Sequence, residues 1–516
     1  MSTVVYRNPA VPGFNPDPSV VFVDGIFYLV TSTFHLFPGL PIYASANLRD
    51  WKLIGHGIHR QDQLSLANAF TKLVQLDTGK DMVATGGLQA PTIRHHAGKF
   101  YILCTNIVRN KTGPSSRDNF IISTTDIWSG QWSDPVPFEF HGIDPSLFVD
   151  DDGKTYVQGA YMHDRREQPT STIYQVELDL ETGKALSDTK SIWEGHFRYD
   201  TEGPHVSKRG GWYYLLAAEG GTFEHHKVTM ARARDIWGPY ESFDGNPVLT
   251  AGGKDEEIQG LGHAELFQDA DGDWWAVALG FRSHDGVWQL GRETFLAQAE
   301  WPDKGWPKIE QPVASFEAKV VAGRSELPHG PEVSDLVHIR GKDEASYEMA
   351  VEESVQVWRL RLSKVLLTDT GGLPTFIGRR QHGFSSSAEA VLDIEKGGEA
   401  LAGFALYFDP LRHAYLGYDF KTRQLVFKVV STPKSIAHEV RLASESKGQV
   451  RLRVAASVEG YVFSYASPDS EWQKAGSVVA RNIWTRYFTG PVMGVFAEGE
   501  AGKDSRVTFR GFKTTD

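Results

Sequence analysis

Apolar runs along this chain are short and soon meet Asp or Gly, as in Val20-Val21-Phe22-Val23. Other runs alternate between apolar and polar residues, for example those at 355–362 and 450–454. A period of two is typical of half-buried β-strands. The composition supports this interpretation, because 51 Gly and 25 Pro supply turns while 14 Trp, 18 Tyr and 29 Phe favour strands. The pattern therefore predicts an all-β protein.

A repeat is visible in the first 300 residues. Five related segments each continue into a Gly-containing turn and an aromatic-rich strand, and they open at Asp17, Ala90, Asp144, Glu202 and His263. Their spacings of 73, 54, 58 and 61 residues exceed the roughly 40 to 50 residues of a minimal propeller blade, so longer loops are expected. The repeat predicts a five-bladed β-propeller whose first strands line a central channel. The opening residues should then meet at one end of that channel.

The repeat fades after residue 307, and the segment up to about residue 335, with Pro328, Gly330 and Pro331, is predicted to be irregular. The alternating runs beyond it keep the strand period but lack a blade-length repeat. We therefore predict a propeller at 1–312, a linker at 313–334 and a β-sandwich at 335–516.

Charge and cysteine content exclude several classes of protein. The chain has 53 Lys and Arg against 65 Asp and Glu, a net charge of −12, and no basic block, so nucleic acid is not an expected partner. The lone Cys104 excludes an internal disulfide framework and is expected to be a small buried apolar residue. No run approaches the roughly 20 apolar residues of a membrane helix, so no membrane partner is expected. No basic and then apolar leader opens the chain. This indicates a cytoplasmic protein, although a chain cleaved after its leader would read the same.

Three carboxylates at the mouth of one channel match what hydrolysis of a glycosidic bond needs. One carboxylate activates water, one carboxylic acid protonates the leaving oxygen, and a third can keep that acid protonated. The alternative is that each Asp-Pro merely starts a turn. Ala90 stands at the same place in the second repeat, so the repeat itself does not require a carboxylate, which favours the catalytic interpretation.

Other motifs are less specific. The acidic segments 150–153 and 269–273 could suggest calcium loops, but their places in the repeat predict hairpin turns. His263 could contact substrate, hold a channel cation through water, or be a core imidazole. The sequence contains no His-Glu-x-x-His motif, Gly-rich phosphate loop or Gly-x-Ser-x-Gly elbow.

Several motifs in order resemble glycoside hydrolase family 43, especially its β-xylosidase branch with a C-terminal concanavalin-like β-sandwich. The resemblance spans essentially the whole chain and rests on the segments Asn15-Pro16-Asp17-Pro18-Ser19, Asp144-Pro145-Ser146-Leu147-Phe148, Thr201-Glu202-Gly203-Pro204-His205, Leu290-Gly291-Arg292-Glu293-Thr294-Phe295 and Tyr487-Phe488-Thr489-Gly490. It implies an inverting mechanism with Asp17 as general base, Glu202 as general acid, and Asp144 orienting that acid and raising its pKa. Inverting carboxyls stand roughly 6.5 to 9.5 Å apart.

The resemblance also implies substrate contacts. Arg292 would bind a sugar hydroxyl, Phe34 would pack on the sugar face, Phe488 would close the pocket from the sandwich, and His263 would contact substrate or a structural calcium ion in the channel. The alternatives are a surface ion pair for Arg292 and core packing for Phe34 and Phe488. No cofactor is required.

One departure bears on specificity, because Gln89 stands where many family members have a pocket Trp. We expect an exo-acting β-xylosidase that releases xylose from the non-reducing ends of short β-xylo-oligosaccharides. An α-L-arabinofuranosidase, or a bifunctional enzyme, is the second expectation. A non-catalytic carbohydrate-binding propeller is the alternative from another class. The oligomeric state is not predicted.

Overall fold

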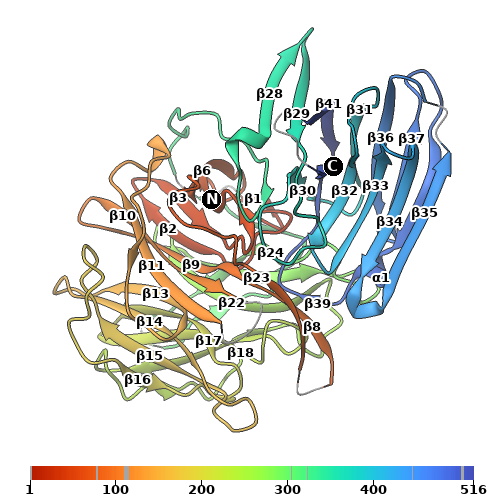
Figure 1. The fold of residues 1–516 in the computed structure, drawn as a ribbon. Coiled ribbons are helices and arrows are strands. Elements are labelled where there is room, and N and C mark those ends of the chain that lie inside the picture. The colour runs from red at the N-terminus through yellow and green to blue at the C-terminus, as the bar shows by residue number, and fades with distance from the viewer. Residues whose placement is uncertain are drawn as a thin grey trace.

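The computed structural model describes residues 3–76, 79–109, 115–303, 305–321, 323–443, 446–500 and 505–516. Within these ranges the chain is almost entirely β-structure, with one short α-helix, α1 (Ala480–Ile483), and three single-turn 3-10 segments at Ile127–Ser129, Glu344–Ser346 and Thr432–Lys434. The sheets of the N-terminal part form a ring, and the sheets of the C-terminal part form a layered lobe beside it (Figure 1). None of the helices in the described part has the length and apolar character needed to cross a membrane.

Five antiparallel sheets follow one another along the chain; each has four strands in sequence order, and the fourth sheet has one further strand. They are β2 (Ser19–Val23), β3 (Ile26–Val30), β5 (Gly39–Ser45) and β6 (Lys52–Ile58); β9 (Gly87–His96), β10 (Lys99–Val108), β11 (Ser116–Thr124) and β12 (Val136–Pro137); β13 (Ile143–Val149), β14 (Thr155–Met162), β15 (Ser171–Glu177) and β16 (Lys190–Trp193); β17 (Glu202–Arg209), β18 (Trp212–Glu219), β19 (Lys227–Ala233) and β20 (Glu241–Ser242), with β21 (Leu249–Thr250) also paired to β19; and β22 (Ile258–Gln268), β23 (Trp274–Arg282), β24 (Glu293–Glu300) and β25 (Lys308–Ile309).

The first strands of these sheets close into a ring. β2 contacts β9, β9 contacts β13, β13 contacts β17, β17 contacts β22, and β22 returns to β2. The strand period of two explains the packing between blades, because alternate side chains point to opposite faces. In β10, Ile102 packs toward the first sheet while its neighbour Leu103 packs toward the third. The predicted all-β propeller is therefore present.

The second lobe is a sandwich of two antiparallel sheets. One contains, in spatial order, β28 (Tyr347–Glu352), β29 (Val355–Arg361), β41 (Arg506–Thr515), β31 (Ser386–Asp393), β36 (Gln449–Ser457), β37 (Gly460–Ala466) and β38 (Gln473–Val479). The other contains β30 (Phe376–Arg380), β40 (Val492–Gly499), β32 (Ala400–Asp409), β33 (Arg412–Asp419), β34 (Gln424–Ser431) and β35 (Ile436–Ala443). Their facing side chains form one core, which includes Trp358, Phe404 and Phe463. The predicted sandwich is thus present as well.

Three small sheets join segments that are far apart in sequence. β1 (Thr3–Arg7) pairs with β26 (Ser315–Lys319), β4 (Leu36–Phe37) pairs with β27 (His338–Ile339), and the hairpin of β7 (Thr71–Gln75) and β8 (Asp81–Thr85) pairs through β8 with β39 (Arg486–Tyr487). Figure 1 shows β8 reaching from the propeller to β39 of the second lobe. The segment 486–490 is thereby held against the propeller, where Phe488 meets the cavity described below.

The segment predicted to be an irregular linker, 313–334, is partly regular. β26 lies within it and pairs antiparallel with β1, with Lys319 opposite Thr3. The ring of Phe316 also stacks on Tyr6 at a centroid distance of 5.4 Å, so backbone pairing and an aromatic contact both hold this segment against β1. The prediction of irregular structure is wrong for these residues, and the domain boundaries at 312 and 335 stay predictions.

Candidate active site

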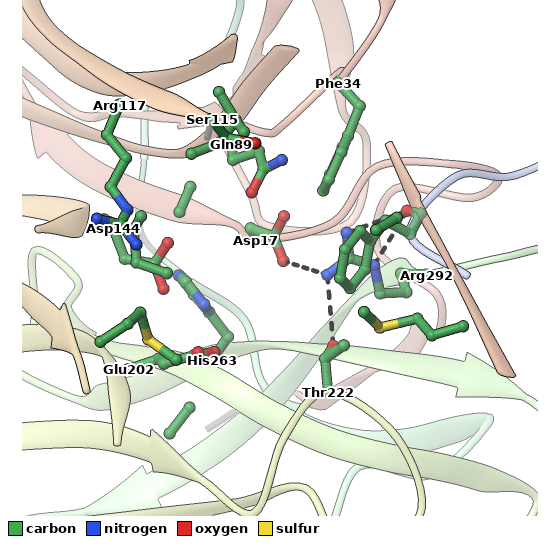
Figure 2. Close-up of a pocket in the computed structure, with 18 of the residues that line it drawn as sticks. Asp17, Phe34, Gln89, Ser115, Arg117, Asp144, Glu202, Thr222, His263 and Arg292 are labelled. Carbon is green, nitrogen blue, oxygen red and sulfur yellow. Dashed lines mark hydrogen bonds and ion pairs between the residues drawn. The ribbon is translucent and has the colours of Figure 1, made fainter. Parts of the chain in front are cut away.

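A cavity of about 380 Å³ lies where the first strands of the propeller begin. This volume is near the lower end of the range of roughly 300 to 1,000 Å³ for small-molecule sites. Its lining contains all eight predicted site residues: Asp17, Phe34, Gln89, Asp144, Glu202, His263, Arg292 and Phe488. Figure 2 shows the side chains of Asp17, Asp144 and Glu202 gathered around one space. Residues from all five sheets and from the second lobe therefore meet at one site.

The first strand of each propeller sheet has the same backbone distortion near its start, and this distortion directs side chains toward the channel. Asp17, Ala90, Asp144, Gly203 and His263 all have left-handed backbone, with φ between 46° and 55°. The pairing register shifts beside four of them, a β-bulge that leaves the neighbouring side chains free of the ladder. Left-handed backbone is strained for residues other than Gly, and such strain often marks functional sites.

This geometry corrects one part of the predicted repeat. The residue equivalent to Asp144 in the fourth sheet is Gly203, and Glu202 lies one position earlier, in the place of Ile143. Gln89 occupies that same place in the second sheet. The two Asp residues therefore share a repeat position, whereas Glu202 approaches the cavity from the adjacent one.

Asp17 lines the cavity and forms an ion pair with Arg292. Its Oδ1 accepts a hydrogen bond from Arg292 Nη1 at 2.9 Å, and the side chains are only 6% and 4% exposed. Arg292 is itself fixed by the backbone carbonyl of Phe488, which accepts hydrogen bonds from Nε at 3.2 Å and Nη2 at 3.0 Å. The second lobe therefore orients the arginine that pairs with Asp17.

Asp144 is tied to the backbone beside Glu202. Its Oδ2 accepts a hydrogen bond from the Gly203 N–H at 3.1 Å. Burial raises the pKa of Asp144, and the negative charge of Asp17 raises it further, while His263 and Arg292 act in the opposite direction. Asp144 can therefore position the peptide that follows Glu202. Its negative charge also raises the pKa of Glu202.

The pKa of Glu202 is raised well above its ordinary value. Burial is the largest cause, the negative charge of Asp200 the next, and that of Asp144 follows, while Arg165 opposes them. A carboxylic acid in these surroundings keeps its proton at a pH where exposed glutamates have lost theirs. Sequence reasoning named Asp144 for this effect and missed Asp200, which lies two residues before Glu202 but stands in no repeat motif.

Aromatic rings form one wall of the cavity. Phe34 stacks against Phe488 at a centroid distance of 5.6 Å, and the Arg292 guanidinium lies 4.9 Å and 5.2 Å from their ring centres. Phe34 also packs on Phe14, and Phe488 on Phe223. Phe34 and Phe488 therefore do both: they line the cavity, as predicted, and they also pack on core aromatic rings.

Gln89 faces the cavity from β9. Its side-chain amide donates to the backbone carbonyl of Thr85 at 3.1 Å, while the backbone carbonyl of Gln89 accepts from the buried Cys104 thiol at 3.2 Å. A polar amide thus occupies the place where family relatives are expected to carry an aromatic ring. Burial raises the pKa of Cys104 well above its usual value, so it behaves as the inert apolar residue that was predicted.

A positively charged side chain, that of Arg94, lies in the channel below the cavity. Arg94 of β9 donates to Leu147 O at 3.0 Å and lies 3.4 Å from Ser19 Oγ, 3.4 Å from His205 Nδ1 and 2.5 Å from Glu265 Oε1. These partners belong to the third, first, fourth and fifth sheets, so one guanidinium joins all five sheets.

This arrangement does not fit the calcium ion that the resemblance implied near His263. Calcium takes six to eight oxygen ligands, but the Glu265 carboxylate is already paired with Arg94. No group of three or more His, Cys, Asp or Glu in the described ranges is arranged to hold a metal ion. The ring of His263 instead packs against Gly203 and lies edge-on to His205 at 6.2 Å.

Further lining residues were not singled out from the sequence. Thr222 Oγ1 lies 3.4 Å from Arg292 Nη1, and the cavity is also lined by Arg109, Ser115, Arg117, Arg165 and His226. They come from loops and strand ends rather than from the repeated openings. Proximity to Asp17 or Glu202 in the folded chain is the only signal that marks them.

A propeller with three carboxylates in one cavity, one paired with arginine and the other two with raised pKa values, has the components of a glycoside hydrolase. The comparisons agree. Residues 6–307 match the family described as "Glycosyl hydrolases family 43", and residues 345–515 match the "Beta xylosidase C-terminal Concanavalin A-like domain". The chain belongs to glycosyl hydrolase family 43, and its second lobe is the predicted concanavalin-like sandwich.

Three similar proteins cover nearly the whole chain. A non-reducing end α-L-arabinofuranosidase of Bacteroides ovatus is 33% identical, over 96% of this chain and 91% of that protein. A xylosidase/arabinosidase of Humicola insolens is 31% identical, over 98% and 96%. The crystal structure of a xylan β-1,4-xylosidase from Bacillus halodurans matches with a TM-score of 0.85 and 26% identity, over 99% and 100% of the two chains.

Proposed function

We propose that the protein is an inverting, exo-acting glycosidase that removes single xylose units from the non-reducing ends of short β-xylo-oligosaccharides. The observation that carries this proposal is the cavity in which Asp17, Asp144 and Glu202 meet against a wall formed by Phe34 and Phe488. A pocket closed on one side by such a wall is suited to the end of an oligosaccharide chain. A cavity of about 380 Å³ suits one sugar ring.

Asp17 is the proposed general base. Its Oδ1 lies 2.9 Å from Arg292 Nη1, and this contact holds the carboxylate in place. The carboxylate accepts one proton from a water molecule as the water oxygen bonds to the anomeric carbon, on the face opposite the leaving oxygen.

Glu202 is the proposed general acid. Burial and the charges of Asp200 and Asp144 favour its protonated form, so it can donate a proton to the glycosidic oxygen as that bond breaks. Asp144, bonded to the Gly203 N–H, positions the acid. One water is consumed, one proton reaches Asp17 and one leaves Glu202, so the site returns to its starting state by exchanging protons with solvent.

An α-L-arabinofuranosidase is the second candidate. It is favoured by the Gln89 amide on the cavity wall, since an amide offers hydrogen bonds where an aromatic ring offers a stacking face. The Bacteroides ovatus relative is named as such an enzyme. The same base and acid would serve either pentose.

Initial rates on an aryl β-xyloside and an aryl α-L-arabinofuranoside test the proposal. We expect the larger kcat/KM on the xyloside, and loss of turnover on both in Asp17→Asn and Glu202→Gln. A large excess for the arabinofuranoside would reverse the ranking of the two sugars. Release of no sugar from any pentoside would contradict the proposed function and favour a carbohydrate-binding propeller.

A further inference from the structure

The rim of the cavity carries two arginines on one hairpin of the second sheet. Arg109 directly follows β10, and Arg117 lies in β11 opposite Ile107. Both residues line the cavity. They are not equivalent to any opening residue of the repeat, and the mechanism above does not use them.

These two arginines differ from the other arginines around the cavity because they lack a carboxylate partner. Arg292 pairs with Asp17, and Arg165 lies 3.2 Å from Asp200. Neither Arg109 nor Arg117 has a carboxylate oxygen of the described chain within 4 Å. The sequence between them, residues 110–114, contains no Asp or Glu.

The two arginines also have few hydrogen-bond partners among the described residues. Arg117 Nη1 donates to the backbone carbonyl of His141 at 3.3 Å. Arg109 Nε is buried and has no hydrogen-bond partner among the described residues. Burial lowers the pKa of Arg109, and the positive charge of Arg117 lowers it further. Two neighbouring guanidinium groups without an anion form a site that an anion would complete.

The place of the pair decides which part of a substrate it meets. Asp17 and Asp144 at the floor are buried, whereas Arg117 is exposed and Arg109 is half-buried. In an exo-acting pocket the terminal sugar occupies the floor, so the leaving part of the oligosaccharide passes the rim. A guanidinium pair there is suited to a carboxylate, which it can bind through paired hydrogen bonds.

We propose that Arg109 and Arg117 bind a carboxylate carried by the leaving part of the substrate, so that the enzyme prefers oligosaccharides bearing a uronosyl group next to the terminal pentose. This inference rests on the proposed exo-glycosidase function and names its substrate class more closely. Uronosyl groups are the sugar units that present a carboxylate at neutral pH.

The test compares two substrates that differ only in that group: a neutral β-xylo-oligosaccharide, and the same oligosaccharide with a uronosyl substituent on the leaving part. The readout is the ratio of kcat/KM for the acidic substrate to kcat/KM for the neutral one. We expect a ratio above one in the wild type at low salt, falling as salt screens the rim charges. Arg117→Gln and Arg109→Gln should each lower the ratio by about three- to five-fold, and Arg117→Lys should keep most of it.

Arg7→Gln is the matched control, because Arg7 is exposed on β1, does not line the cavity, and its loss changes the net charge equally. Its ratio should equal that of the wild type. A wild-type ratio of one, or an equal loss on both substrates in Arg117→Gln, would overturn the inference while leaving the glycosidase intact. Failure to cleave either substrate would instead contradict the proposed function itself. Because Arg117 is exposed, its variants test the proposal even if Arg109→Gln fails to fold.

Discussion

At the scale of single residues, the proposed chemistry depends on the proton of Glu202. Three independent features favour the protonated form: burial, the charge of Asp200 and the charge of Asp144. Asp17 is more deeply covered than Glu202, and its Oδ1 lies 2.9 Å from Arg292 Nη1. The two carboxyl groups of one cavity therefore have different charged neighbours, as an acid and a base in one site require.

Removal of either neighbouring charge should shift the pH dependence in one direction. A general acid works while it is protonated, so kcat/KM falls as the pH rises through the pKa of Glu202. Asp144→Asn and Asp200→Asn remove negative charge, which stabilises ionised Glu202 and lowers its pKa. We therefore expect the alkaline limb of the pH profile of kcat/KM to move to lower pH in both variants.

Asp188→Asn is the control for this prediction, because Asp188 is exposed and lies outside the cavity lining. Its profile should coincide with that of the wild type. An alkaline limb that stays in place, or moves to higher pH, in both Asp144→Asn and Asp200→Asn would remove the electrostatic assignment of Glu202.

At the scale of elements, the bulge at the start of each first strand is the device that builds the site. Gly203 shows how tightly it is made, since a Cβ added there would lie 2.8 Å from His263 Nδ1, and its φ is +55°. The acid-bearing and histidine-bearing strands are therefore packed with no room for a side chain between them.

Gly203→Ala should reduce activity through this contact. The methyl group has to displace His263 or the peptide that Asp144 holds, and misplacement by about 1 Å can cost roughly 100-fold in rate. Gly98→Ala is the matched control, because Gly98 also has a left-handed φ, +77°, but has nothing within 4 Å of the added Cβ. Both changes strain the backbone by about 1 to 2 kcal/mol.

We expect only Gly203→Ala to lower kcat, measured alongside thermal unfolding of both variants. Equal kcat losses in the two variants would mean that backbone strain alone matters and that the His263 contact has no part in positioning.

Most of the elements could be predicted from the sequence, because the strand period and the repeated Gly turns predict a propeller. Asp17 and Asp144 are also recognisable, since each precedes the proline of its repeat. Glu202 was placed one position out of register. Aligning Pro204 with Pro18 and Pro145 puts Gly203 at the shared left-handed position. Residues such as Asp200, Arg94 and Arg117 act through contacts between blades, which no local pattern records.

At the scale of the whole molecule, two long-range connections hold the site together. The second lobe reaches the cavity through Phe488, whose carbonyl binds Arg292. The propeller is joined at its centre by Arg94, whose charge meets the buried carboxylate of Glu265. An internal guanidinium therefore has the role that a bound cation could have in such a channel.

Arg94→Met should destabilise the fold strongly, since it removes the cation that pairs with the buried Glu265 carboxylate. Loss of one member of a buried pair costs about 3 to 5 kcal/mol, and Arg94→Met/Glu265→Gln should recover part of it. Urea unfolding measures the free energy of unfolding of both variants.

Treatment of the wild type with a chelator should leave activity unchanged. Loss of activity on chelation, restored by calcium, would contradict the account of the channel.

The stereochemistry of the first product tests the central claim most directly. Proton NMR during hydrolysis of an aryl β-xyloside, whose leaving group is not a sugar, distinguishes the xylose anomer released by the enzyme before mutarotation equilibrates it. A single displacement by water activated at Asp17, with Glu202 as acid, predicts that the released xylose appears first as the α-anomer and that Glu202→Gln releases almost none. First appearance of the β-anomer would contradict the inverting mechanism and the roles assigned to both carboxyl groups.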